Sequence, residues 1–232
     1  TPLLSDLEPR QRQGVLSDWQ LPKSDGNGFN RESLLKARQL LLDAGFYYQD
    51  MQLYQPNGER AQIEILMTGD TLGRVLLPYI RNIERLGFAA NLRQVDGPQY
   101  YERTRRYDYD MTTDVFAQSL SPGAEQAAFW GSAAADEVGN RNTIGIKNSA
   151  IDTVLEALGD AESREEIVLY TKVLDRLLRA GHYLVPLYGK SGTNVAYWSQ
   201  YRHTTLPTNA VGIDYWWVDK KAEAKVNDYL KR

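Results

Sequence analysis

The sequence contains no cysteine and only two histidines, and these shortages limit its chemistry. Without a thiol there is no cysteine nucleophile, no thiolate metal ligand and no disulfide within the chain. His182 and His203 lie far apart in the sequence and do not form the closely spaced pair that many metal sites use. His182 stands at the end of a predicted helix beside apolar residues, where a helix-terminal or core role is more common than ligation. We therefore expect no metal site.

Phosphate-binding and serine-nucleophile motifs are also missing. The sequence has no GxxxxGK[ST], GxGxxG or GxSxG motif, and no calcium loop of regularly spaced acidic residues. We therefore expect no cofactor. The net charge of -3 and a pI of about 5.5, without a basic stripe, argue against a nucleic-acid partner. No apolar run approaches the roughly 18 residues that a membrane-spanning helix needs.

Aromatic residues, in contrast, are abundant. Fifteen tyrosines and five tryptophans suit a wet binding cleft, because their rings offer contact area together with a polar tip. The alternative is that they fill an ordinary core, which we expect of about half of them. A chain of 232 residues with 42% hydrophobic content can bury one large core or two small ones.

The first 28 residues show no sustained periodicity. Pro9, Pro22 and the turn-rich run from Lys23 to Gly28 predict an irregular segment that connects to something upstream. No signal peptide is visible, and because the sequence opens abruptly at Thr1 we expect processing or truncation rather than cytosolic residence.

Two helices in the first half have clear start and stop signals. Asn30 can cap the first helix and Gly45 can end it; Asp70 is predicted to cap the second, which ends before Gly87. The apolar faces consist of Leu34, Leu35, Ala37, Leu41 and Leu42 in the first helix, and of Leu72, Val75, Leu76, Tyr79, Ile80, Ile83 and Leu86 in the second.

Strands are predicted around these helices. Residues 62–67 alternate in polarity and residues 89–95 form a second strand; a polar hairpin-like turn around residues 55–58 precedes them. Asp96 starts a short helix, and residues 109–115 form the next strand. Strand, helix, strand, helix, strand is the order typical of a mainly parallel α/β sheet.

The second half is predicted to be helical first and extended later. Residues 151–158 form a short helix, and a capping box of Ser163 with Glu166 precedes a long one. Residues 182–188 are apolar but contain a proline, which suits an edge strand that residues 195–201 could pair with. The tail from Thr204 contains two adjacent tryptophans and ends in polar residues.

The stretch from Tyr107 to Lys147 is the candidate site, because polar and aromatic residues gather there. Ligands of open α/β folds collect at the carboxyl ends of strands, which here means Phe116 to Ser119, including Gln118. Ser121-Pro122 predicts a helix start, with Glu125 in its first turn, and free N–H groups there would suit a carboxylate or a peptide carbonyl. The alternative is an ordinary loop between a strand and a helix.

A hydrolase is the main enzymatic alternative, because carboxylates distant in sequence can converge in space. Asp108, Asp110 and Asp114 would share one strand face, which more simply meets solvent or basic partners. We therefore expect no catalysis. A non-transport interaction or chaperone-like role on the same fold is a third possibility.

Several motifs in order resemble extracellular solute-binding proteins of family 5, the peptide-binding subunits of ABC importers. KARQLLLDAGF resembles the family's A-x-x-L-L-x-x-A-G helix, and I-x-x-L-G-F and Y-D-Y-D-M follow in the family's order. SLSPGAEQAAFWGSAAAD, GNRNTIGIKN and the late AYW and WW-D motifs are most similar to the branch of the microcin C and oligopeptide-binding protein. Together these motifs cover roughly Leu21 to Asp219.

The resemblance implies one lobe of a type II periplasmic-binding-protein fold, an α/β lobe with a mixed, mainly parallel sheet flanked by helices. Residues 1–28 would arrive from a missing N-terminal lobe, residues 29–203 would form the distal ligand-binding lobe, and residues 204–232 would return to the missing lobe. The protein would work in the periplasm, with an oligopeptide ligand and the permease subunits of the transporter as partners.

The resemblance also assigns ligand contacts. Peptide binders of the family carry a tryptophan followed three residues later by an aspartate that holds the ligand's α-amino group; the matching positions here are Phe116 and Ser119. Asp114 or Glu125 would have to supply the missing acid. Arg141 and Asn142 are expected to contact the peptide backbone or carboxylate.

Overall fold

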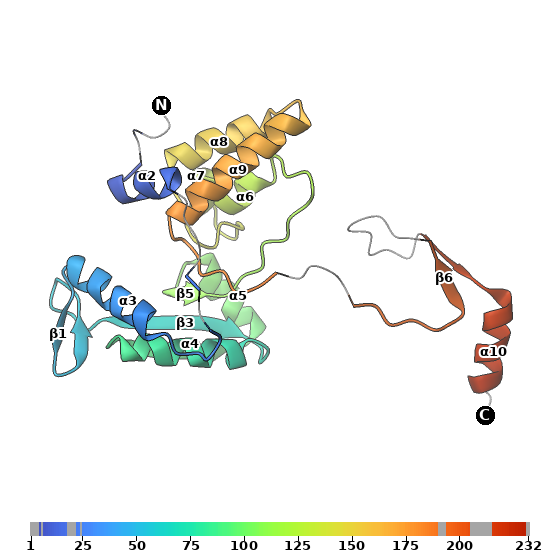
Figure 1. Cartoon of the computed structure of the whole chain (residues 1–232), viewed down its shortest axis with the longest axis horizontal. Coiled ribbons are helices and arrows are strands. Elements are labelled where there is room, and N and C mark those ends of the chain that lie inside the picture. Colours follow the sequence, from blue (N-terminus) through green and yellow to red (C-terminus); the bar gives the residue numbers. More distant parts are fainter. Residues whose placement is uncertain are drawn as a thin grey trace. The chain divides into compact units, whose positions relative to one another are not determined.

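The computed structural model describes residues 5, 7–17, 22–23, 25–189, 194–204 and 215–230. These belong to two compact units, Thr1–Leu184 and Val185–Arg232 (Figure 1). The division falls about twenty residues before the boundary expected at 203. The assignment of the three sequence segments to lobes of a larger protein stays a prediction.

A small parallel sheet forms one part of the first unit, as the sequence predicted. Strand β3 (Gln62–Thr68) lies in the middle, between β4 (Ala89–Val95) and β5 (Met111–Thr112). Helices α4 (Gly73–Arg85) and α5 (Gly97–Arg105) connect the strands. Because successive strands run in parallel, each needs such a crossover to return to the same end of the sheet.

The core beside this sheet lies between β3 and α4. Ile65 and Met67 of β3 are almost fully buried and pack against one face of α4. Leu66, on the other face of β3, is buried as well, because a central strand is covered on both sides. The buried residues that α4 contributes are Leu76, Ile80 and Ile83.

Helix α3 (Arg31–Asp43) begins where predicted, because the side chain of Asn30 accepts a hydrogen bond from the Ser33 N–H at 2.9 Å. None of its residues is buried, so its apolar residues do not form the covered face that the sequence predicted. The hairpin of β1 (Tyr47–Gln49) and β2 (Gln52–Tyr54) follows, and the predicted turn at residues 55–58 comes after it.

The other part of the first unit is helical. It comprises α2 (Pro9–Leu16), α6 (Gln126–Trp130), α7 (Ser132–Asp136), α8 (Ser149–Gly159) and α9 (Arg164–Ala180), which lie together in Figure 1. Helix α2 corrects the prediction of an irregular start. It packs closely on α9, since a Cβ at Gly14 would lie 3.1 Å from the Ala180 Cβ.

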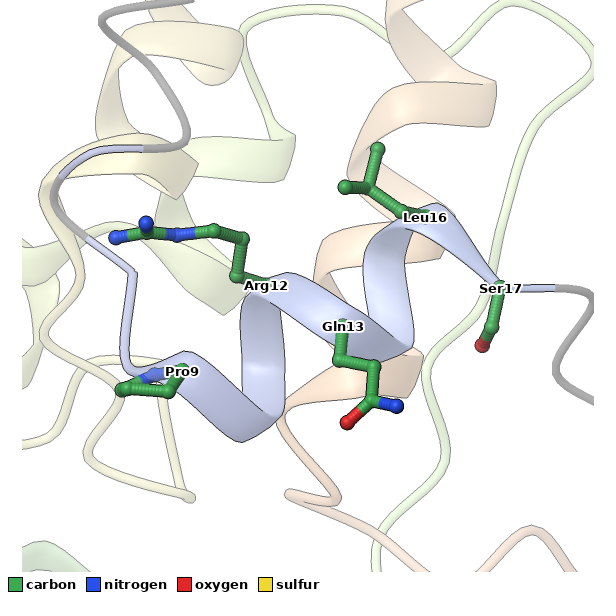
Figure 2. Close-up of a pocket in the computed structure, with 5 residues that line it drawn as sticks. All are labelled: Pro9, Arg12, Gln13, Leu16 and Ser17. Atoms are coloured by element: carbon green, nitrogen blue, oxygen red, sulfur yellow. The ribbon is translucent and has the colours of Figure 1, made fainter.

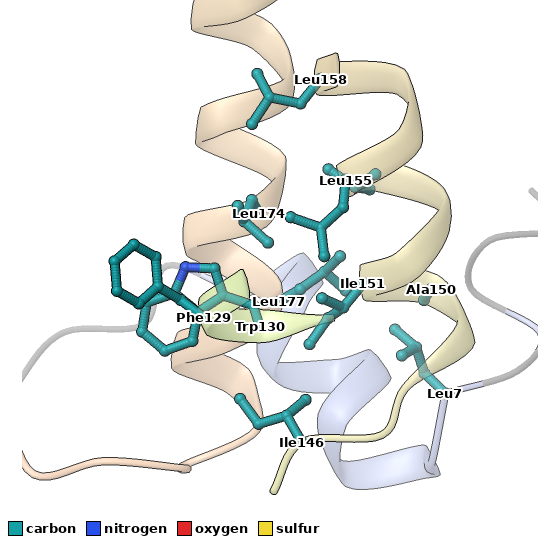
Figure 3. Packing of buried hydrophobic residues seen from close by; sticks show 11 residues of the cluster. Leu7, Phe129, Trp130, Ile146, Ala150, Ile151, Leu155, Leu158, Leu174 and Leu177 are labelled. Atoms are coloured by element: carbon teal, nitrogen blue, oxygen red, sulfur yellow. The ribbon is translucent and has the colours of Figure 1, made fainter. Parts of the chain in front are cut away.

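The core of this helical part is dominated by α8 and α9. Figure 3 shows Ile151, Leu155 and Leu158 of α8 facing Leu174 and Leu177 of α9. The predicted capping box fixes the start of α9: the Ser163 hydroxyl accepts from the Glu166 N–H, and the Glu166 carboxylate accepts from the Ser163 N–H. Phe129 and Trp130 of α6 belong to the same core.

The strand predicted at residues 109–115 is reduced to the two residues of β5. At Asp110 a side-chain hydrogen bond takes the place of backbone pairing: the Asp110 carboxylate accepts from the Glu64 N–H at 2.7 Å. At the other end, Asp114 accepts from the Val115 N–H at 2.7 Å. The Asp110 carboxylate thus occupies a backbone N–H of β3. The local bond of Asp114 competes with a strand ladder at the other end, which explains the early end of β5.

Two further predictions are corrected. Asp70 does not cap α4: its carboxylate accepts from Gln94 at 2.6 Å, and Leu72 occupies the cap position. Residues 182–188 form no strand among the described residues; Pro186 lacks the N–H that a ladder needs, and Leu184, Val185 and Leu187 are about half exposed.

The second unit contains a short antiparallel pair and a final helix. Strand β6 (Tyr201–His203) pairs with β7 (Trp216–Val218), so residues 195–200 are not the strand that the sequence suggested. Helix α10 (Lys220–Leu230) follows β7. Within the described ranges, no helix has the length and apolar character to cross a bilayer.

Candidate ligand-binding site

The predicted site begins in the segment between β5 and α6. Residues 113–125 form neither helix nor strand, but hydrogen bonds to other parts of the chain hold the segment at two points. Asp114 accepts a hydrogen bond from the Thr143 hydroxyl at 2.8 Å. Arg164, the first residue of α9, donates to the Leu120 carbonyl at 2.5 Å. An irregular segment held by rigid elements is a common location for binding residues.

Phe116 provides an aromatic platform in this segment. Its ring centre lies 4.6 Å from that of Trp130 and 5.8 Å from that of Phe129, with an edge-on arrangement to the latter. Both partners are nearly buried, whereas Phe116 is only partly covered. Contacts of this kind stabilise aromatic pairs beyond their buried area. The helical core therefore holds the Phe116 ring while leaving part of it accessible.

A chain of side-chain hydrogen bonds runs alongside the rings. The Trp130 indole N–H donates to Gln126 Oε1 at 3.1 Å, and Gln126 Nε2 donates to Gln118 Oε1 at 2.8 Å. Gln126 is almost fully buried, while Gln118 is exposed. The four-residue spacing of Gln126 and Trp130 places both on one face of α6. The exposed Gln118 amide is thus connected to the core through Gln126.

Glu125 stands next to this chain. Its carboxylate accepts from Gln126 Nε2 at 3.1 Å and from the Gly123 N–H at 3.0 and 3.1 Å. These bonds favour the charged form, so the hydrogen bond from Gln126, followed by the one from Gly123, lowers the pKa of the Glu125 carboxyl below its usual value. Glu125 is consequently an anion at neutral pH, but its oxygens already have donors within the chain.

Arg141 reaches the same aromatic group from a different segment. Its guanidinium carbon lies 4.7 Å from the centre of the Phe129 ring. Phe116 packs against the same ring in a T-shaped arrangement, so Phe129 of α6 supports both Phe116 and Arg141. Arg141 is exposed, and stacking on a ring leaves the in-plane N–H donors of a guanidinium available.

Asn142, the next residue, has a structural role. It is fully buried, its Nδ2 donates to the Gly131 and Ile146 carbonyls at 2.9 and 3.0 Å, and its Oδ1 accepts from the Gly145 and Ile146 N–H groups at 3.0 Å each. A primary amide has two donors and two acceptor positions. All four are used within the chain, so the expected ligand contact by this side chain does not fit the arrangement.

Ser119 lies in the exposed part of the segment, where its hydroxyl accepts from the Ser121 N–H at 3.1 Å. The helix expected to start at Ser121-Pro122 begins instead at Gln126 and is only five residues long. Its first three N–H groups donate to the backbone carbonyls of residues 123–125. The predicted anion site at a helix amino terminus is therefore not formed.

The structure thus brings Phe116, Gln118, Glu125 and Arg141 together around α6, with Ser119 nearby in the same segment. Sequence reasoning missed the three residues that organise them, namely Gln126, Phe129 and Trp130. The available signal was the polar Gln126 one helical turn before a tryptophan. Their convergence with Arg141 requires the tertiary fold.

This arrangement can stack on flat groups and hydrogen-bond polar ones. It contains no histidine, and Asp110, the acid on which a hydrolase was considered, uses its carboxylate to hold the Glu64 N–H. In the part of the chain that the structure describes, no histidines or acids gather into a possible metal site.

A hollow of about 480 Å³ lies elsewhere, on α2. Figure 2 shows that its lining comes from this one helix and the residue after it, with Arg12 and Leu16 prominent. The Arg12 guanidinium is engaged with the carbonyls of Ser5 and Leu7. A surface of a single helix encloses little of a ligand, so this hollow does not compete with the site around α6.

Curated proteins from rhizobia and related bacteria are similar in sequence. The chain is 43% identical over 190 residues, covering 81% of the chain, to the uncharacterized protein y4wM of Sinorhizobium fredii, of which it covers 29%. It is 36% identical over 94% of its length to the probable peptide-binding protein YejA of Agrobacterium fabrum, of which it covers 36%. The peptidoglycan-binding protein YepA of the same organism is 35% identical over 85% of the chain, which covers 32% of it.

Solved structures share the fold. The oligopeptide-binding protein AppA from Bacillus subtilis, in complex with a nonapeptide, matches with a TM-score of 0.62, covering 94% of this chain and 46% of that one at 14% identity. The periplasmic binding protein DppA from Helicobacter pylori, in complex with the peptide STSA, has a TM-score of 0.54 at 19% identity, covering 76% of this chain and 34% of that one. No protein-family model matches the chain.

These likenesses confirm the expected fold class: the chain has the α/β fold of type II periplasmic binding proteins. The chain spans about a third of the length of the curated relatives it matches. Several of those relatives and neighbours are named as binding proteins, and none of the proteins reported above is named as an enzyme. These names agree with the expectation of no catalysis.

Proposed function

We propose that this chain is the distal lobe of the substrate-binding component of an ABC importer. That component captures oligopeptides in the periplasm and delivers them to the permease subunits in the membrane. The observation that carries the proposal is the arrangement around α6, where Phe116 and Arg141 share the Phe129 ring and remain accessible. Flat peptide groups can stack there, and carbonyls or carboxylates can accept from the guanidinium.

The names of the relatives support a peptide as the ligand. YejA of Agrobacterium fabrum is called a probable peptide-binding protein, and the structural neighbours AppA and DppA contain peptides. The fold alone does not select the ligand: a neighbour with a TM-score of 0.56, NikZ from Campylobacter jejuni, holds Ni(L-His). The argument for a peptide therefore depends on the sequence relatives and on the chemistry of the site.

A second lobe would supply the facing wall of the cleft. The accessible residues of the site form one surface, and ligand sites commonly bury 70–90% of a small ligand. Because the chain spans about a third of its relatives, the rest of a longer protein could provide that second wall. Closure of the two lobes would then be a hinge movement around the bound peptide.

Modified peptides are part of the proposed ligand range. Motifs of this sequence resemble the microcin C and oligopeptide-binding branch, and one relative is named a peptidoglycan-binding protein. Ser119 stands where peptide binders of the family are expected to carry an aspartate for the α-amino group. We propose that the ligand contacts are Phe116, Gln118, Ser119, Glu125 and Arg141, while Asn142 supports them from within.

Calorimetry on the full-length gene product tests this function. Trialanine, tetra-alanine and Ser-Thr-Ser-Ala are titrated into the wild-type protein and into the Phe116→Ala and Arg141→Ala variants. Wild-type binding that both substitutions weaken, each by about tenfold, is the expected result. Leu169→Ala, an exposed change on α9, is the control and keeps wild-type affinity. Affinities that neither substitution changes would contradict the site.

A further inference from the structure

Arg141 has no acidic partner in the chain as far as the structure describes it. No carboxylate of the described residues lies within 4.0 Å of its guanidinium. The backbone before the side chain is fixed, because the Arg141 N–H donates to Asn140 Oδ1 at 2.6 Å. The five guanidinium N–H donors lie in one plane, and the Phe129 ring covers only a face of that plane, so ligand oxygens can replace the solvent at its edge.

The acids closest in sequence to the site are already engaged. Asp114 accepts from Val115 N–H and the Thr143 hydroxyl, and Glu125 accepts from Gly123 N–H and Gln126. Asp136 pairs with Lys147, and Glu137 accepts from Asn140 at 2.9 Å. The carboxylates around this segment therefore have donors within the chain, while the exposed Arg141 has no acidic partner among the described residues. A ligand anion is the complement of that pattern.

Two tyrosines hold the segment that carries Arg141. The Tyr109 hydroxyl donates to the Thr143 carbonyl at 2.5 Å, and the Tyr107 hydroxyl donates to the Asn142 carbonyl at 2.8 Å. These carbonyls belong to the two residues directly after Arg141. Bonds to the main chain fix a loop more firmly than contacts between flexible side chains, because they leave its backbone with fewer conformations.

Tyr107 itself adopts an uncommon backbone conformation, with φ at 54°. A residue with a bulky side chain keeps such a conformation only when its surroundings determine it, and residues of this kind concentrate at functional sites. Here the left-handed turn aims the phenol at the segment after Arg141, and the Tyr107 ring also packs on Gly145, where a Cβ would lie 3.4 Å away.

We propose that Tyr107 and Tyr109 are positioning residues that hold Arg141 over Phe129, so that its guanidinium selects ligands that present a carboxylate. The inference rests on the proposed function and names the chemical group of the ligand that the same site recognises. Two parallel N–H donors of a guanidinium match the two oxygens of a carboxylate. An amide offers one oxygen and no charge, so it binds less well. The tyrosines contribute through geometry, without touching the ligand.

The experiment uses trialanine, tetra-alanine and Ser-Thr-Ser-Ala, each with a C-terminal carboxylate and with a C-terminal carboxamide. Calorimetry on the full-length gene product compares the affinities of the two forms. The wild-type protein is expected to prefer the acid by about tenfold or more. Arg141→Ala abolishes this preference. Tyr109→Phe, which keeps the ring and removes only the hydroxyl, reduces the preference several-fold while affinity for the amide changes little.

A matched control separates positioning from stability. Tyr48→Phe removes the same kind of bond elsewhere, since the Tyr48 hydroxyl donates to the Leu86 carbonyl at 2.9 Å. This variant keeps the acid preference. In an Arg141→Ala background, Tyr109→Phe has no further effect on acid affinity, because its role is exerted through Arg141.

Three results would overturn the inference. Equal wild-type affinities for acid and amide would refute it and leave peptide binding intact. A Tyr109→Phe effect that is the same for acid and amide, or that persists without Arg141, would show a merely structural bond. If the wild-type protein binds none of the peptides, the proposed function fails and the inference fails with it.

Discussion

Asn142 shows how a single residue can determine the shape of a binding loop. Its amide joins the backbone of Gly131, at the end of α6, to that of Gly145 and Ile146. The sequence motif around it marked the residue as important but could not separate a ligand contact from an internal link. The two roles differ in burial, and burial is a property of the folded chain.

Asn142→Ala is expected to lower the free energy of unfolding by about 3 kcal/mol, because it removes the side-chain partner of three buried backbone groups, the Gly131 and Ile146 carbonyls and the Ile146 N–H. The urea unfolding midpoint measures this loss. Asn91→Ala changes an exposed asparagine of β4 and is expected to stay within about 0.5 kcal/mol of wild type. Equal midpoints for the two variants would contradict the internal role of Asn142.

Tyr109 makes stability depend on alkaline pH. Burial is the largest cause that raises the pKa of its phenol from 10.0 to about 12, with smaller contributions from Tyr107, Tyr100 and Asp114. A raised pKa stabilises the folded state fully below the unfolded value, and this contribution disappears as pH rises from 10 to about 12. Urea midpoints measured across that range should fall less steeply in Tyr109→Phe than in wild type. Parallel declines would refute the assignment.

At the scale of elements, helices were predictable because their signals are local. Asn30 and the Ser163–Glu166 pair cap α3 and α9 as expected, and the periodicity of α4 and α8 identified the residues that they bury. The parallel sheet followed from the order of elements. These signals lie within a few residues of the structure that they specify.

The predicted strand boundaries were wrong where hydrogen-bond partners distant in the sequence determine the end of a strand. Asp110 bonds to the backbone of Glu64, forty-six residues away, and Asp114 bonds to Thr143. The segment after β5 was therefore identified as polar but misjudged as a strand. In the same way, the sequence selected Phe116 and Arg141, but their meeting on Phe129 depends on how α6 packs into the helical core.

The contribution of α9 to that core can be tested with two leucines of one helix. Leu177 is fully buried and Leu169 is 56% exposed. Leu177→Ala is expected to cost about 3 kcal/mol through lost burial and the remaining cavity, whereas Leu169→Ala should cost at most about 0.5 kcal/mol. Urea unfolding followed by tryptophan fluorescence compares them, since Trp130 lies in the same core. Similar losses in both variants would show that α9 is packed differently.

At the scale of the first unit, the two hydrophobic cores stabilise different parts of the fold. One core joins β3 to α4 and stabilises the sheet; the other joins α8 and α9 and includes the α6 rings under the site. The segments that carry Phe116 and Arg141 are both tied to the second core. We therefore expect the site to keep its geometry and to move as a rigid wall in the proposed closure on a ligand.

Closure itself is the whole-molecule prediction. Gln118, Ser119 and Arg141 are exposed, so a peptide on this wall alone would keep much of its surface in water. If a second lobe closes over this wall, as proposed, the radius of gyration of the full-length gene product should fall when one of the test peptides is added at saturation. Small-angle X-ray scattering measures this change. Phe116→Ala needs more peptide for the same decrease, because the substitution weakens binding to the wall without blocking the hinge. Binding seen by calorimetry with an unchanged radius of gyration would mean that the ligand is held without closure, and that the exposed surface around α6 carries the affinity by itself.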